Sequence, residues 1–103
     1  MLVQLLYFPD CPNVNAARGA LKQALSHVEG APAVVEIDVT DAAAPADLRS
    51  WGSPTILVDG VDVAGSEPSG SCCRLYPQSG LRGVPSPALI EAALRRARQP
   101  PSP

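Results

Sequence analysis

Three cysteines are the side chains of this 103-residue sequence best suited to covalent chemistry. Cys11 follows an apolar run and precedes a segment with helical apolar spacing, so we expect it at the N-terminus of a helix. The unpaired N–H groups and the dipole at that end of a helix stabilise a thiolate, the nucleophilic form of cysteine. Pro12 suits the first helical position, where no N–H partner is needed. We therefore predict that Cys11 is a reactive thiol.

Cys72 and Cys73 stand side by side in a segment, residues 65–85, that is rich in Gly, Ser and Pro. A loop of that length in a small domain is usually functional or disordered. Adjacent cysteines seldom pair with each other, because disulfide geometry strains the peptide between them. The two thiols suit either a resolving role, in which one attacks a mixed disulfide on Cys11, or a soft-metal site. The alternative is that they are small buried apolar residues.

Asp10, directly before Cys11, has two interpretations. Its carboxyl group can donate a proton to a leaving group, as cleavage of a carbon–metal bond would require. As a turn or N-cap residue it would instead accept hydrogen bonds from helix N–H groups, and we favour this second role. His27 is the only histidine. We expect it to be a surface residue late in the first helix and not a base.

Composition narrows the class of protein. The apolar fraction is 46% and the net charge is −2, with no basic cluster except Arg95, Arg96 and Arg98, which argues against a nucleic-acid partner. No stretch is long enough to cross a bilayer, and Met1–Phe8 lacks a basic leader, so we expect neither a membrane segment nor a signal peptide. We expect a cytoplasmic protein, in which cysteines serve redox or metal chemistry more often than structural disulfides.

The elements that must position these residues follow from apolar periodicity and turn signals. Asp59-Gly60 predicts a type I′ hairpin, and Ser86 followed by Pro87 predicts a helix start. The order is β-α-β-α-β-β-α, an α/β domain over residues 1–98 with a Pro-rich disordered tail, 99–103. Helices should cover the faces of a mixed four-stranded sheet. The expected strands are 2–8, 33–39, 55–58 and 61–63, and the expected helices run from 12 to about 27, from 45 to 51 and from 87 to 98.

This order, with a cysteine after the first strand and a proline opening the hairpin, resembles the thioredoxin/glutaredoxin superfamily. The segments that carry the resemblance are residues 8–13 (FPDCPN) and 52–60 (GSPTILVDG). With residues 72–76 (CCRLY) they are similar to small bacterial thioredoxin-like proteins labelled alkylmercury-lyase-like. Val14 stands where the family usually has a second cysteine. Cys11 therefore either works as a single thiol or has its partner elsewhere.

The resemblance implies several substrate-binding residues. Pro54 would be cis and lie against Cys11, where the alternative is an ordinary trans proline at a strand start. Ser53 would offer its backbone N–H and C=O to an extended substrate. Pro12 and Arg74 complete the set, and Arg74 would bind a glutathione-like carboxylate unless it is a solvated loop residue.

Topology predicts where a partner for Cys11 lies. The third strand should start beside the end of the first, and the fourth should run back toward that edge. Gly65 should then emerge near Cys11, and seven extended residues reach ~20 Å. Cys72 or Cys73 would thus come within disulfide or metal-bridging range of Cys11.

Three functions are compatible with these residues. The leading hypothesis is a thiol-disulfide oxidoreductase-like protein that needs no bound cofactor, acts on a thiol or disulfide substrate and uses Cys72, Cys73 or a glutathione-like thiol to resolve Cys11. The second is a soft-metal protein, binding Hg or Cu through the three thiolates, or an organomercurial-lyase-like enzyme with Asp10 as proton donor. The third is a non-catalytic thioredoxin-like scaffold.

Overall fold

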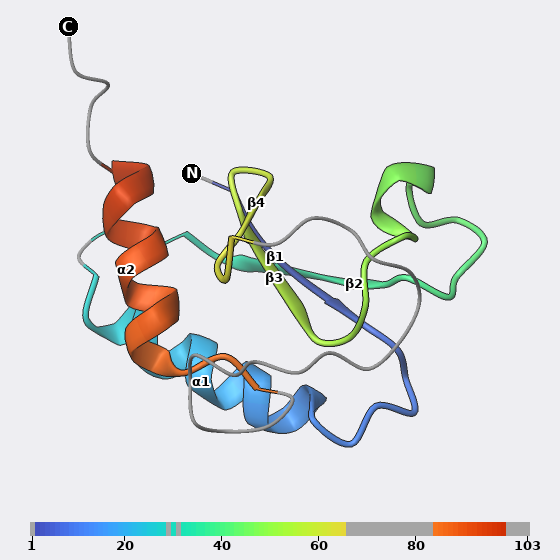
Figure 1. Cartoon of the computed structure of the whole chain (residues 1–103), viewed down its shortest axis with the longest axis horizontal. Coiled ribbons are helices and arrows are strands. Elements are labelled where there is room, and N and C mark those ends of the chain that lie inside the picture. Colours follow the sequence, from blue (N-terminus) through green and yellow to red (C-terminus); the bar gives the residue numbers. More distant parts are fainter. Residues whose placement is uncertain (1, 29, 31, 66–83, 99–103) are drawn as a thin grey trace, which may run out of the picture.

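The computed structural model describes residues 2–28, 30, 32–65 and 84–98. Over these residues the chain forms an α/β domain built on one four-stranded sheet (Figure 1). The strands lie in the order β2-β1-β3-β4. Their bounds and those of the helices are β1 Val3–Tyr7, α1 Val14–Ser26, β2 Val34–Asp38, the 3-10 turn η1 Ala46–Leu48, β3 Thr55–Val58, β4 Val61–Asp62 and α2 Pro87–Arg98.

The sheet is mixed, as predicted. β1 is parallel to β2 and antiparallel to β3, and β3 is antiparallel to β4. The parallel pair is joined through α1, since parallel strands need a crossover connection. Asp59 and Gly60, in the turn between β3 and β4, have φ of 51° and 83°. A type I′ turn requires positive φ at both central residues, so the predicted hairpin is confirmed.

β1 is the centre of the core because its two faces are both buried. Leu5 packs among residues of α1, α2 and β3, whereas Leu6 packs on the opposite face against Leu48 and Trp51. Leu5 and Leu6 are each fully buried. Successive strand residues point to opposite faces, so this near-continuous apolar strand fits a sheet that is covered on both sides.

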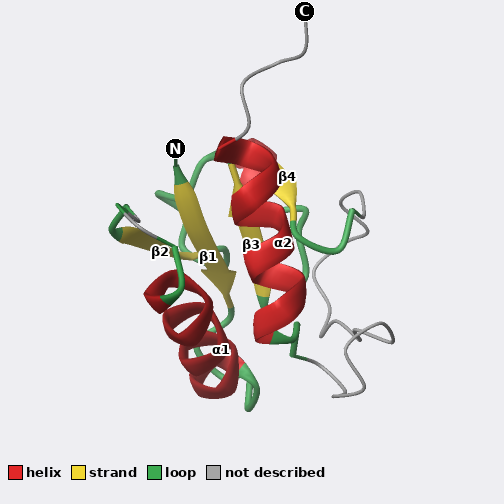
Figure 2. Cartoon of the chain, turned by 90° about the vertical axis from the view of Figure 1, so that its left-hand side faces the viewer, coloured by secondary structure: helices red, strands yellow, loops and turns green. Residues whose placement is uncertain are grey.

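Both α-helices cover the same face of the sheet (Figure 2). The other face is covered by η1 and the residues around it, where a helix over 45–51 was expected. The expected helix was longer than the observed 3-10 turn, Ala46–Leu48. The N–H groups of Leu48, Arg49 and Trp51 each bond the carbonyl three residues earlier, which winds a 3-10 turn. Such turns seldom continue, because their hydrogen-bond geometry is poor.

The two α-helices begin differently. At α2, the Ser86 Oγ accepts a hydrogen bond from the Leu89 N–H at 3.2 Å, which is the predicted N-cap. At α1, the first helical residue is Val14 and the N-cap is Asn13, whose side chain makes no capping hydrogen bond. The expected start at Pro12 was therefore two residues too early.

Candidate functional site

The candidate site lies at the carboxyl end of β1, and the backbone of Phe8 holds it together. The Phe8 N–H donates a hydrogen bond to the Oγ of Ser53 at 3.1 Å. The Phe8 carbonyl accepts a hydrogen bond from the Cys11 N–H at 3.0 Å, which closes the turn over residues 8–11. One residue thus connects the cysteine turn with the segment that enters β3.

Cys11 lies ahead of α1 and not on its first turn. Its carbonyl accepts a hydrogen bond from the Val14 N–H at 3.4 Å, and the first helical bond runs from the Ala17 N–H to the Asn13 carbonyl. Pro12 is an exposed residue between the two turns. Cys11 is a free cysteine with only 8% of its surface exposed. A reagent therefore reaches this sulfur through a narrow opening or after a local movement.

The peptide bond between Ser53 and Pro54 is cis, which confirms the isomer predicted for Pro54. The Thr55 Oγ1 donates to the Gly52 carbonyl at 2.7 Å, bridging the proline. Thr55 pairs with Leu6, so this segment enters β3 beside the last residues of β1. The sheet register therefore brings Pro54 to the edge that carries Cys11.

Ser53 has a contact that the sequence did not predict. Ser53 is fully buried, and its hydroxyl accepts a hydrogen bond from the Phe8 N–H. The role predicted for Ser53 involved only its backbone N–H and C=O, which would bind the substrate. A buried polar side chain needs a hydrogen-bond partner, so a serine placed between Trp51 and Pro54 was the available signal.

Asp10 is exposed and occupies the turn before Cys11. Its carboxylate makes no hydrogen bond to the described residues, so the favoured capping role is not observed. Exposure explains this difference, because water solvates the carboxylate. The role of Asp10 as a proton donor stays a prediction.

Cys72, Cys73 and Arg74 lie outside the described residues. The path that leads toward them is described as far as Gly65. The Val63 N–H bonds the Ile56 carbonyl at 3.1 Å and the Gly65 N–H bonds the Asp62 carbonyl at 2.9 Å, so the chain returns toward the start of β3. The Gly65 bond closes a turn over residues 62–65, so Gly65 lies beside the middle of β3, two strand spacings, or about 10 Å, from β1. That the chain emerges near Cys11 stays a prediction.

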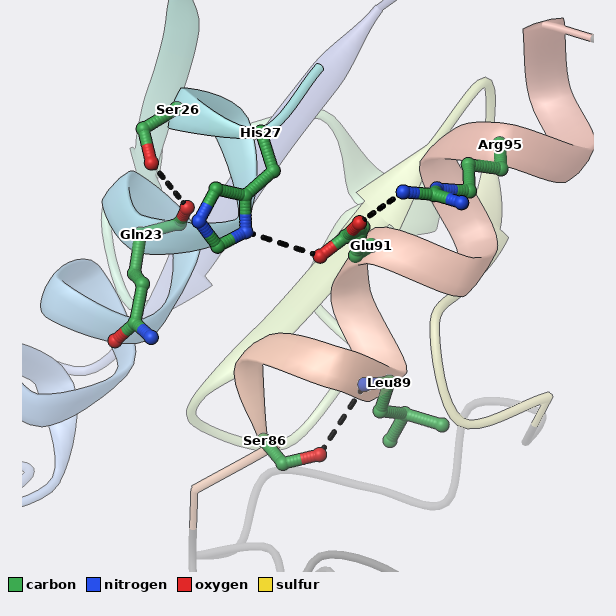
Figure 3. Close-up of polar contacts among 7 residues, drawn as sticks. All are labelled: Gln23, Ser26, His27, Ser86, Leu89, Glu91 and Arg95. Atoms are coloured by element: carbon green, nitrogen blue, oxygen red, sulfur yellow. Dashed lines mark hydrogen bonds and ion pairs between the residues drawn. The ribbon is translucent and has the colours of Figure 1, made fainter.

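His27 lies at the other end of α1 from Cys11, as expected for a surface residue. Its Nδ1 is 3.2 Å from Glu91 Oε2 on α2, and Arg95 pairs with the second oxygen of Glu91 (Figure 3). The hydrogen bond with His27, followed by that with Arg95, lowers the pKa of Glu91. This network joins the two helices away from the candidate site.

Among the described residues, no three His, Cys, Asp or Glu side chains are grouped as metal ligands would be. No helix in the described ranges is long and apolar enough to cross a bilayer. Comparison of the chain with protein-family models, curated proteins and solved structures finds no match. The architecture is an α/β domain with a mixed four-stranded sheet.

Proposed function

We propose that this chain is a thioredoxin-like thiol redox protein in which Cys11 is the nucleophile. The observation that carries the proposal is the double hydrogen bond of Phe8, which ties the Cys11 turn to Ser53. A disulfide that approaches this edge would meet the sulfur and the entrance to β3 together. The proposed substrate-binding residues are Pro12, Ser53 through its backbone N–H and C=O, Pro54 and Arg74.

The proposed reaction is thiol–disulfide exchange. The Cys11 thiolate attacks one sulfur of the substrate disulfide, the S–S bond breaks, and one half leaves as a thiolate that takes a proton from water. The other half stays on Cys11 as a mixed disulfide. A glutathione-like thiol then attacks the sulfur of Cys11 and releases the second half as a thiol, which leaves the small thiol bound to Cys11. A second equivalent attacks the small thiol's sulfur in that bond, forms its oxidised disulfide and frees Cys11.

Cys72 or Cys73 would provide an intramolecular second step. Its thiolate would attack the sulfur of Cys11 and release the bound half of the substrate as a thiolate. The protein would be left with a disulfide, having given two electrons to the substrate. Two equivalents of a glutathione-like thiol would then reduce it. The direction of β4, which runs back toward the start of β3, supports this step.

The test is a thiol-coupled reductase assay on wild type and on Cys11→Ser, Cys72→Ser and Cys73→Ser. We expect Cys11→Ser to abolish turnover and one of the other two variants to accumulate the mixed disulfide, detected as added mass. Activity retained by Cys11→Ser would contradict the proposal. Turnover absent with every disulfide, together with tight Hg(II) or Cu(I) binding by the reduced protein, would favour the soft-metal alternative instead.

The rate of alkylation of each cysteine against pH separates these possibilities further. A redox nucleophile should react faster at neutral pH than the same residue in the unfolded chain. Three uniformly slow thiols would indicate a non-catalytic scaffold.

A further inference from the structure

A second candidate site lies at the opposite end of the sheet from Cys11. Val58, Val61, Ala93 and Ala97 line a pocket of about 240 Å³ between the β3–β4 hairpin and α2, and Asp59 and Arg96 border it. We call this pocket the hairpin notch. It is smaller than the ~300 Å³ at which drug-sized sites begin, so it suits a small ligand.

The interior of the notch is apolar. Val58 and Ala93 form its buried part, with 3% and 8% of their surfaces exposed, whereas Val61 is 63% exposed. Val58 and Val61 are cross-strand partners and so share the face that α2 covers. Ala93 and Ala97 lie one helical turn apart, and their short side chains leave the space that a larger residue would fill.

Arg96 provides a positive charge that has no partner among the described residues. Among the arginine side chains that the structure describes, Arg18 pairs with Glu36, Arg95 pairs with Glu91, and Arg49 donates to backbone carbonyls. Arg96 makes no hydrogen bond or ion pair to the described residues. A guanidinium with its donors free binds carboxylates, often with two parallel hydrogen bonds.

Asp59 provides the opposite charge. Its Oδ1 accepts the Leu2 N–H at 2.7 Å, and its other carboxylate oxygen makes no hydrogen bond within the described residues. Asp62 also borders the notch, but it pairs with Leu57, whose side chain packs on the opposite face of the sheet. Its carboxylate therefore lies on that opposite face, and Asp59 is the acid that faces a ligand.

We propose that the hairpin notch binds a small zwitterion with an aliphatic side chain, of the class of a branched α-amino acid. Its carboxylate would pair with Arg96, its ammonium with Asp59, and its side chain would fill the space over Val58 and Ala93. Because both charges border one small pocket, a single compact molecule reaches them together.

The test is a titration of the isotope-labelled protein with L-leucine, followed by amide chemical shifts. We expect saturable shifts at Val61 and Ala97 at millimolar ligand. Arg96→Gln and Asp59→Asn should each weaken binding about tenfold or more, the effect of one charged contact. Asparagine keeps an acceptor for the Leu2 N–H and tolerates positive φ, so Asp59→Asn should fold. Arg95→Gln, outside the notch, and Cys11→Ser should bind as wild type does.

Two analogues of leucine test whether the notch recognises both the ammonium and the carboxylate of the ligand. Isocaproate lacks the ammonium and isopentylamine lacks the carboxylate, and each should bind at least several-fold more weakly than leucine. Absence of saturable shifts with leucine would overturn the proposal. The proposal would also be overturned if Arg96→Gln bound leucine as tightly as the wild type does, or if either analogue bound as tightly as leucine.

Discussion

The Ser53 hydroxyl accepts a hydrogen bond from the backbone N–H of Phe8, although 45 residues separate the two in the sequence. This contact joins the first residue of the cysteine turn to the residue before the cis proline. It also provides a partner for an N–H that lies just past the last paired residue of β1. The two halves of the proposed site are thus held together by the hydroxyl of one buried side chain.

Ser53→Ala should destabilise the fold by about 1–3 kcal/mol, because it leaves the Phe8 N–H without its partner in a partly buried position. The free energy of unfolding in urea measures this effect. Ser50→Ala is the matched control, because the Ser50 hydroxyl is exposed and donates to the Asp47 carbonyl at 3.3 Å. Equal stability of the two variants would show that the Phe8 contact contributes nothing.

Acid should weaken the contact between the two α-helices. The pKa of Glu91 is lowered in the folded protein by its hydrogen bond with His27. A lowered carboxyl pKa contributes stability that is complete above the unfolded pKa, about 4.3, and is lost as the pH falls through the folded pKa. When the pH is lowered from neutral to below the unfolded pKa, the free energy of unfolding of the wild type should therefore fall by more than that of Glu91→Gln.

The measurement for Glu91 is chemical denaturation at a series of pH values, at low and high salt. Added salt should reduce the difference, since the side chains of His27 and Arg95 are exposed. Asp10→Asn is the control, because Asp10 makes no hydrogen bond to the described residues. If Glu91→Gln and Asp10→Asn show the same pH dependence, the interhelical network does not contribute.

Two glycines should respond oppositely to alanine. A Cβ at Gly19 would meet no atom within 4 Å, so Gly19→Ala should stabilise α1 by about 1 kcal/mol through helix propensity. Gly60 has a φ of +83° in the hairpin turn, so Gly60→Ala should destabilise by about 1–2 kcal/mol. Thermal unfolding of both variants checks the signs. A loss of stability in Gly19→Ala would reveal a packing role that the structure does not show.

The strands and turns could be predicted from the sequence because their signals are local. Asp59-Gly60 specifies its hairpin through backbone conformation, and Ser86 caps its helix within three residues. The end of β1 and the start of β3 follow from apolar runs bounded by prolines. The prediction that Cys11 and Pro54 share one edge of the sheet also needed the expected topology, because local signals do not determine which strands pair.

The features that the sequence predicted wrongly, or did not predict, depend on contacts distant in the sequence or on competing hydrogen bonds. Which face α2 covers depends on its packing against α1 and β3, and no local pattern encodes that choice. The segment at 45–51 has apolar spacing that suits a helix, yet its N–H groups bond at the shorter 3-10 interval. Ser53 could not be matched to Phe8 without the register of β1 and β3.

Trp51 is the single tryptophan of the chain, and it is buried behind the sheet three residues before Pro54. Its indole ring is therefore an intrinsic optical reporter of the segment that enters β3. Any rearrangement that opens this edge to a disulfide would alter the emission of one fluorophore. Stopped-flow fluorescence could follow that opening in the native protein, with no label attached.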